Sequence, residues 1–135
     1  MRRHSHLVII GFSAQEWEER KNLLAKALNA RGERWSFDDY RFDSDSPSVT
    51  RLREHLGGKH ERIDLIVVGS HAHLGEVHSL LQMSEGWPIK PPVVLFHDLK
   101  KPFASRLRRA GFGVFPHELI VETVRAGASK ELAMA

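Results

Sequence analysis

The stretch Ile63-Asp64-Leu65-Ile66-Val67-Val68 carries the strongest strand signal in this chain, and Gly69 follows it directly. A short, continuous apolar run that is rich in β-branched residues is typical of a strand buried on both faces. Strands of this kind occur in parallel sheets that are covered by helices on both sides. We therefore expect residues 63–68 to form the central strand of an α/β sheet.

Similar strand signals recur along the chain and alternate with segments of helical period. Further strands are predicted over residues 7–10, 34–37, 92–96 and 114–115. Helices are predicted over residues 14–31 and 47–56, through residues 77–84 and 103–110, and from residue 118 onward. The segment Asp38 to Ser48 holds four aspartates and three serines, so we predict a loop there.

Five successive βα units with right-handed crossovers build one parallel sheet with helices on both faces. Five units in 135 residues fit a flavodoxin-like or CheY-like (βα)5 fold with strand order 2-1-3-4-5 better than the longer dinucleotide-binding fold. We expect one domain of this fold over residues 1–125. Residues 126–135 are predicted to be a helix extension or a linker.

Composition sets further limits on the function. Hydrophobic residues make up 41% and charged residues 27%, the balance of a globular domain. The chain has no cysteine, and its net charge of +3 does not indicate direct binding to nucleic acid. The apolar run Leu7 to Ile10 is too short for a signal peptide or a membrane span, so we expect a cytoplasmic protein with no membrane contact.

The order of these segments resembles the receiver domains of bacterial response regulators over nearly the whole chain. Asp64 to Val68 is similar to the third strand of that family, and Pro92 to Phe96 is similar to its fourth. The segment Arg109 to Pro116 resembles the run from its fourth helix through its fifth strand. The resemblance implies a regulatory domain with a phosphorylation site at the carboxyl ends of the strands.

The residues that would carry phosphorylation have all changed. Gly11 and Phe12 stand where the family has its acidic pair, and Gly69 stands where it has the phosphoacceptor aspartate. His97 replaces the hydroxyl residue and His117 replaces the lysine. Phosphoryl transfer to a carboxylate needs that carboxylate, a divalent ion and a positive charge. We therefore predict a degenerate receiver domain that is not an enzyme and needs no cofactor.

Within this family, the substitution at Gly69-Ser70 is most similar to the FleQ-like regulators, which act with sigma-54 polymerase. That resemblance implies attached ATPase and DNA-binding domains in a larger signalling protein. The domain would then regulate transcription through dimerisation or another protein contact. We expect a homodimer whose interface uses residues of the fourth and fifth helices, namely Arg106, Leu107, Arg109, Glu118 and Glu122.

The loops that follow the predicted strands also allow two alternative functions. The run Asp64 to His71 also resembles the universal stress proteins, in which a glycine loop binds nucleotide phosphates, although Ala72 and Leu74 stand where glycines are expected. Several histidines also follow predicted strands, and imidazoles gathered at that edge could bind a metal ion. These histidines are His71, His73, His97 and His117. We expect exposed loop histidines and no metal site, with this group as the alternative.

Overall fold

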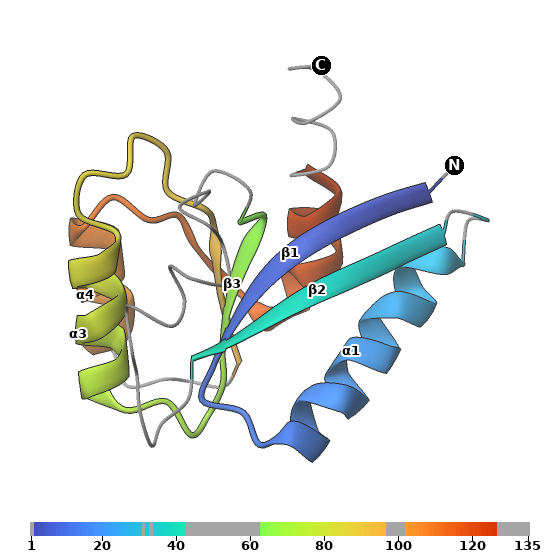
Figure 1. The fold of residues 1–135 in the computed structure, drawn as a ribbon, viewed down its shortest axis with the longest axis horizontal. Coiled ribbons are helices and arrows are strands. Elements are labelled where there is room, and N and C mark those ends of the chain that lie inside the picture. Colours follow the sequence, from blue (N-terminus) through green and yellow to red (C-terminus); the bar gives the residue numbers. More distant parts are fainter. Residues whose placement is uncertain (1, 31, 33, 43–62, 97–101, 127–135) are drawn as a thin grey trace.

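A computed structural model describes residues 2–30, 32, 34–42, 63–96 and 102–126 of the 135-residue chain (Figure 1). The elements in chain order are β1 (Arg2–Ile10), α1 (Ala14–Asn29), β2 (Arg34–Phe42), β3 (Leu65–Val68), α3 (Leu74–Met83), β4 (Val93–Leu95), α4 (Pro102–Arg109), β5 (Val114–Pro116) and the 3₁₀ turn η2 (His117–Leu119). An α-helix over residues 120–126 continues directly from η2. The helix predicted over residues 47–56 and the tail after residue 126 lie outside the described residues.

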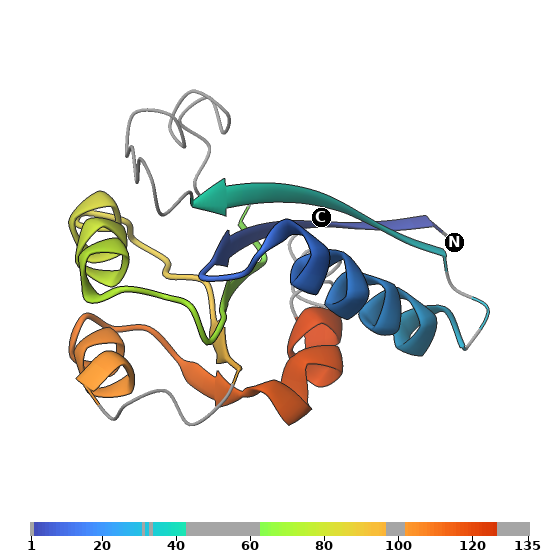
Figure 2. The same ribbon diagram turned by 90° about the horizontal axis from the view of Figure 1, so that it is seen from below.

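The five strands form a single parallel sheet in the order β2-β1-β3-β4-β5. This order confirms the predicted flavodoxin-like fold. Figure 2 shows α3 and α4 on one side of the sheet, and α1 with the C-terminal helix on the other. No helix among the described residues is long and apolar enough to span a membrane.

The central strand β3 is completely buried, as its sequence predicts. Leu65 and Val67 pack into the core beneath α1 and the C-terminal helix. Ile66 and Val68 point to the opposite face and pack against α3 and α4. Each fully buried aliphatic side chain of this size contributes about 1.5–3 kcal/mol to stability. The sheet is therefore held by two apolar cores that share the same short strands.

The first two strands are longer than their apolar residues indicate. β1 begins at Arg2 instead of Leu7, and β2 continues to Phe42, with Arg2 opposite Arg34 and Ile10 opposite Phe42. The prediction of a loop from Asp38 is therefore wrong for residues 38–42. Polar side chains fit in this part of β2 because their hydrogen-bond partners lie on the neighbouring strand β1 or on α1.

Asp39 shows how an aspartate is accommodated inside β2. Its Oδ2 accepts hydrogen bonds from Trp17 Nε1 and from Lys21 Nζ, each at 3.0 Å. The hydrogen bond to Asp39 raises the pKa of Lys21 above its usual value. Hydrogen bonds to a charged group contribute about 1.5–3 kcal/mol, so this contact helps to fix α1 on the edge strand.

Candidate functional site at the carboxyl ends of the strands

Functional sites in open α/β sheets lie beyond the carboxyl ends of the strands. In this protein that edge is formed by Gly11 and Phe12 after β1, by residues 69–73 after β3, and by Phe96 after β4. His117 follows β5 at the same edge. Four of the five positions at which a phosphorylation site was sought can therefore be examined directly, namely Gly11, Phe12, Gly69 and His117. His97 lies outside the described residues.

The backbones at the ends of β1 and β3 approach each other closely. The Gly69 amide donates a hydrogen bond to the Ile10 carbonyl at 2.7 Å. A Cβ atom on Gly69 would lie 2.5 Å from the Gly11 carbonyl oxygen and 2.8 Å from the Phe12 ring. These separations are shorter than van der Waals contact. The position that corresponds to the phosphoacceptor therefore has no room for any side chain in this backbone arrangement.

Gly11 is constrained in the same way. Its φ angle is +76°, in the left-handed region that favours glycine. A Cβ atom at this position would overlap the backbone of Ala72. Glycine is thus required at both strand ends by the close packing of the two loops.

The loop after β3 uses its backbone amides internally. His71 N donates to the Gly11 carbonyl at 3.0 Å, and Ala72 N donates to the Gly69 carbonyl at 3.2 Å. His73 N donates to Glu76 Oε1 at 2.9 Å, at the start of α3. A phosphate-binding loop needs its N–H groups directed at the anion. This geometry therefore does not favour the nucleotide-binding alternative.

An aromatic cluster fills the space next to this loop contact. The ring centroids of Phe12 and Trp17 lie 5.7 Å apart, and those of Phe12 and Phe96 lie 5.4 Å apart in an edge-on arrangement. The His117 ring stacks on Phe96 at 5.2 Å, and the Arg20 guanidinium lies over the same ring at 5.3 Å. Aromatic rings and the Arg20 guanidinium thus occupy this part of the edge, and neither supplies the oxygen ligands that Mg²⁺ prefers.

The polar residues of the loop do not form a nucleophilic relay. Ser70 Oγ lies 3.2 Å from His71 Nδ1, and Glu16 Oε1 lies 3.9 Å from that same nitrogen. A serine–histidine–acid triad uses the two imidazole nitrogens for two different partners. Because both oxygens meet one nitrogen here, the histidine cannot be oriented by the acid while it accepts the serine proton.

The histidine-based metal alternative is not supported by the histidines that can be placed. His71, His73 and His117 do not come together as a set of three ligands. His71 lies beside Glu16, whereas His117 stacks on Phe96. With His97 outside the described residues, the complete group of four is not tested.

The residues of the expected interface occupy different environments. Arg106, Arg109, Glu118 and Glu122 are exposed. Leu107 is completely buried in the core between the sheet and the helices α3 and α4, so its assignment to the interface is wrong. It lies on the inner face of α4, one position from the exposed Arg106 and Arg108.

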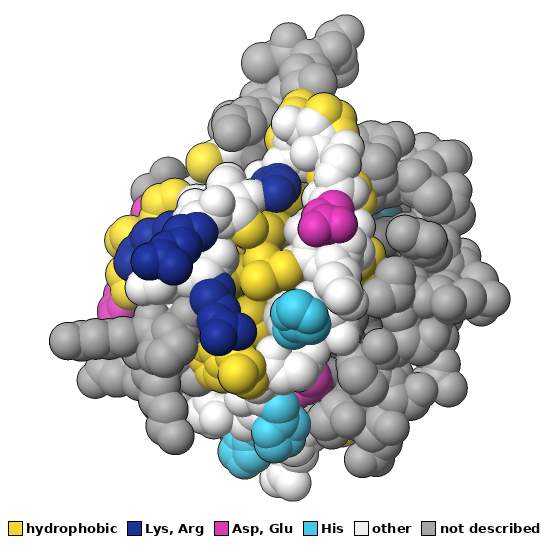
Figure 3. All heavy atoms as spheres, turned by 90° about the vertical axis from the view of Figure 1, so that its left-hand side faces the viewer, with side chains coloured by type: hydrophobic (Ala, Val, Ile, Leu, Met, Phe, Trp, Pro, Cys, Tyr) yellow, Lys and Arg dark blue, Asp and Glu magenta, His cyan; other side chains and the backbone are white. Residues whose placement is uncertain are grey.

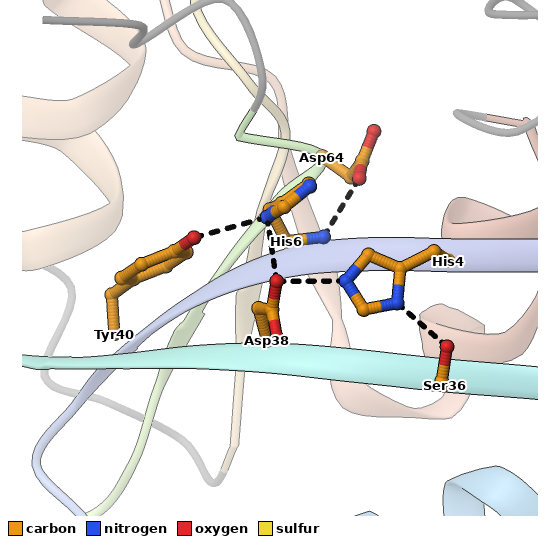
Figure 4. A network of polar contacts seen from close by, with 6 residues as sticks. All are labelled: His4, His6, Ser36, Asp38, Tyr40 and Asp64. Carbon is orange, nitrogen blue, oxygen red and sulfur yellow. Dashed lines mark hydrogen bonds and ion pairs between the residues drawn. The ribbon is translucent and has the colours of Figure 1, made fainter. Parts of the chain in front are cut away.

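A second polar cluster, missed in the sequence, lies near the amino ends of β1 and β2 (Figure 4). It contains His4, His6 and Asp38, hydrogen-bonded to Ser36 and Tyr40. His4 and His6 are two residues apart, and this spacing places two side chains on the same face of a strand. Recognising the cluster also required the register that places Asp38 opposite His6.

No protein-family model matches this chain, and no curated protein matches its sequence. Among solved structures, the fold is similar to a crystal structure of a response regulator receiver domain protein from Clostridium thermocellum. The TM-score is 0.52 and the sequences are 11% identical, over 97% of this chain and 99% of that one. At this level of identity the likeness shows the receiver-type fold alone.

Because the backbone packs closely at Gly69, alanine should lower the stability of the protein at this position but not at Gly75. Gly69→Ala should lower the free energy of unfolding by about 1–3 kcal/mol, because the added methyl group must displace backbone or the Phe12 ring. Gly75→Ala is the matched control, since a Cβ there meets nothing within 4 Å and alanine is preferred in α3. Urea unfolding of both variants measures the difference, and equal stabilities would contradict the close contact.

Proposed function

We propose that this chain is a pseudo-receiver, a receiver-type domain that regulates transcription through protein contacts and without phosphorylation. The observation that carries the proposal is the closed approach of Gly11 and Gly69 at the ends of the two central strands. A receiver that is switched by phosphate needs an open site at this point. Here a side chain at residue 69 would collide with the loop after β1.

The chemistry of the surrounding residues supports the same proposal. Acyl phosphate formation needs a nucleophilic carboxylate and a divalent ion that neutralises the phosphoryl oxygens. Gly69 offers no nucleophile, and the Phe12 carbonyl at this edge accepts a 2.6 Å hydrogen bond from the Arg41 guanidinium. The nearby rings of Phe12 and Phe96 offer no metal ligand. Such a domain must then regulate by binding other proteins or other domains.

The FleQ-like context is part of this proposal. The sequence resemblance at Gly69-Ser70 suggests a domain that acts within a larger regulator, joined to an ATPase and a DNA-binding domain. In that arrangement the domain would control the assembly of the attached ATPase. The universal stress protein alternative receives no support from the loop, because three of its amides bond within the protein.

Incubation with a small phosphodonor tests the absence of phosphoryl chemistry. After treatment with acetyl phosphate and Mg²⁺, the intact mass should be unchanged, because residue 69 has no nucleophile and no room for a side chain. A functional receiver domain treated in parallel is the positive control. A stoichiometric phosphate adduct on any aspartate of this chain would refute the proposal.

The surface formed by α4, β5 and η2 is the candidate contact. Arg106 and Arg109 are exposed on α4, while Glu118 and Glu122 are exposed on η2 and the helix that follows. Phe115 on β5 is 38% exposed and Leu119 on η2 is 41% exposed. In the proposed interface, these two side chains supply the apolar contact that was expected of Leu107.

A second copy of the chain is the occupant that this surface fits. Figure 3 shows that Lys and Arg side chains gather on the α3 and α4 side of the molecule, next to an apolar strip. In a two-fold pair, the basic α4 of one subunit can lie against the acidic η2 region of the other. Exposed charges set partner and orientation, whereas apolar residues such as Phe115 and Leu119 supply most of the affinity.

Charge reversal tests this dimer. Arg106→Glu with Arg109→Glu should weaken self-association by at least about fourfold, because exposed ion pairs contribute about 0.2–1 kcal/mol each and symmetry doubles their number from two to four. Adding Glu118→Arg and Glu122→Arg should restore part of the affinity. Sedimentation equilibrium measures the three dissociation constants.

Lys26→Glu with Arg34→Glu is the matched control for that experiment. It makes the same change in net charge at exposed positions on α1 and β2. Its dimer should be as stable as that of the unchanged protein. The interface is ruled out if the unchanged protein stays monomeric at about 100 µM. It is also ruled out if the variant with all four substitutions associates no more tightly than the double variant.

A further inference from the structure

The amino-terminal part of the β1–β2 ribbon brings two imidazoles and a carboxylate together on one face of the sheet (Figure 4). Side chains two residues apart in a strand point to the same side, so His4 and His6 share a face with Val8. Val8 packs in the core beneath α3 and α4, which identifies that face. The parallel register sets Asp38 opposite His6 and next to the pair.

The distances within this group suit a metal ion. His4 Nε2 lies 2.8 Å from Asp38 Oδ2, and His6 Nδ1 lies 3.5 Å from the same oxygen. One ligand atom from each residue lies within 4.8 Å of the other two. Tetrahedral Zn²⁺ with bonds of about 2.0–2.2 Å separates neighbouring ligand atoms by roughly 3.3 Å. The 3.5 Å separation between His6 Nδ1 and Asp38 Oδ2 is close to that spacing.

The group is also held in place by outer contacts, as metal ligands usually are. Ser36 Oγ lies 2.6 Å from His4 Nδ1, the ring nitrogen that does not face Asp38. Such a contact fixes the orientation and the tautomer of a ligating histidine. The backbone of His6 is tied to β3, because its N–H donates to Asp64 Oδ2 at 2.8 Å and its carbonyl accepts from Asp64 N at 2.9 Å.

The hydrogen bond with His4 lowers the pKa of Asp38. His4 and Asp38 are exposed to solvent and His6 is half-buried, so an ion can reach the group from water. Among the described residues, this is the one set of three side chains with metal-ligand spacing.

We propose that His4, His6 and Asp38 bind a divalent first-row transition metal ion, with Zn²⁺ as the reference ion. Two imidazoles and one carboxylate match the ligand preference of Zn²⁺ and its neighbours, and poorly match that of Mg²⁺ or Ca²⁺. Three protein ligands leave a position for water. The bound ion joins β1 to β2 in the part of the ribbon that extends beyond β3, whose pairing with β1 begins at Leu7.

This proposal is independent of the pseudo-receiver proposal. The metal group lies near the amino end of β1, whereas the closed loop contact lies at its carboxyl end. A metal ion here would give a domain without a phosphorylation site a different chemical input. The two ideas can therefore fail separately.

Titration of the full chain with Zn²⁺ tests the site. Isothermal calorimetry at about pH 7.5 should show one saturable ion per chain with a dissociation constant in the micromolar range or below. His4→Ala, His6→Ala and Asp38→Ala should each weaken binding by at least about 100-fold, since even outer-contact changes cost roughly 10–100-fold. Circular dichroism confirms that each variant is folded.

Two control variants separate this site from adventitious histidine binding. His78→Ala removes an exposed histidine of α3 that is outside the group and should leave the affinity unchanged. Tyr40→Phe removes the hydroxyl that lies 3.1 Å from His6 Nδ1 and should bind Zn²⁺ at least as tightly, because it removes a competitor for that nitrogen.

Co²⁺ supplies a spectroscopic readout. Ligation by two imidazoles and a carboxylate with few waters should give visible d–d absorption that the three ligand variants lose. Binding no tighter than about 1 mM, or equal weakening by His78→Ala and His4→Ala, would overturn the proposal.

Discussion

The close backbone approach between the ends of β1 and β3 is the constraint on which this edge of the molecule depends. The Gly69 amide bonds to Ile10, and no Cβ fits on either Gly11 or Gly69. Because the two loops touch, the amides of residues 71 and 72 find their acceptors inside the protein. The Phe12 ring turns toward Phe96 and takes part in an aromatic cluster. The loops that follow β1 and β3 are therefore packed directly against each other.

The two ends of β1 therefore differ in chemistry. At the carboxyl end, the described residues 11, 12, 69 and 96 form backbone contacts and aromatic contacts, and none of them carries a carboxylate. Near the amino end, polar side chains of β1 and β2 form a compact hydrogen-bonded group around Asp38. Between them, the apolar residues Leu7 to Ile10 are buried on both faces of the sheet. The group around Asp38 is thus separated by the buried part of β1 from the residues at the carboxyl edge.

The sequence predicts those features that depend on local apolar pattern. Leu65 to Val68 are buried on both faces, and this pattern alone indicates a central parallel strand and, with the alternation of helices, the strand order. The lack of a nucleophile at position 69 is also readable from the sequence, since that residue is glycine. The steric reason is not readable, because it depends on how close the Gly11 carbonyl lies to Gly69.

Features that depend on partners across the sheet were missed. Asp38 and Asp39 look like loop residues until their partners His4, Trp17 and Lys21 are placed beside them. Leu107 follows an exposed arginine, and only the helix orientation shows that it belongs to the core. The metal-ligand spacing of His4, His6 and Asp38 needs the register between two strands that are far apart in the sequence.

The most direct test of the closed site is a nuclear magnetic resonance titration with beryllofluoride and Mg²⁺, which together mimic the phosphoryl group of an aspartyl phosphate. The amide resonances of residues 11, 12 and 69–73 should not shift with added ligand, because residue 69 carries no carboxylate and no Cβ fits at that position. Saturable, Mg²⁺-dependent shifts clustered at these residues would contradict the account.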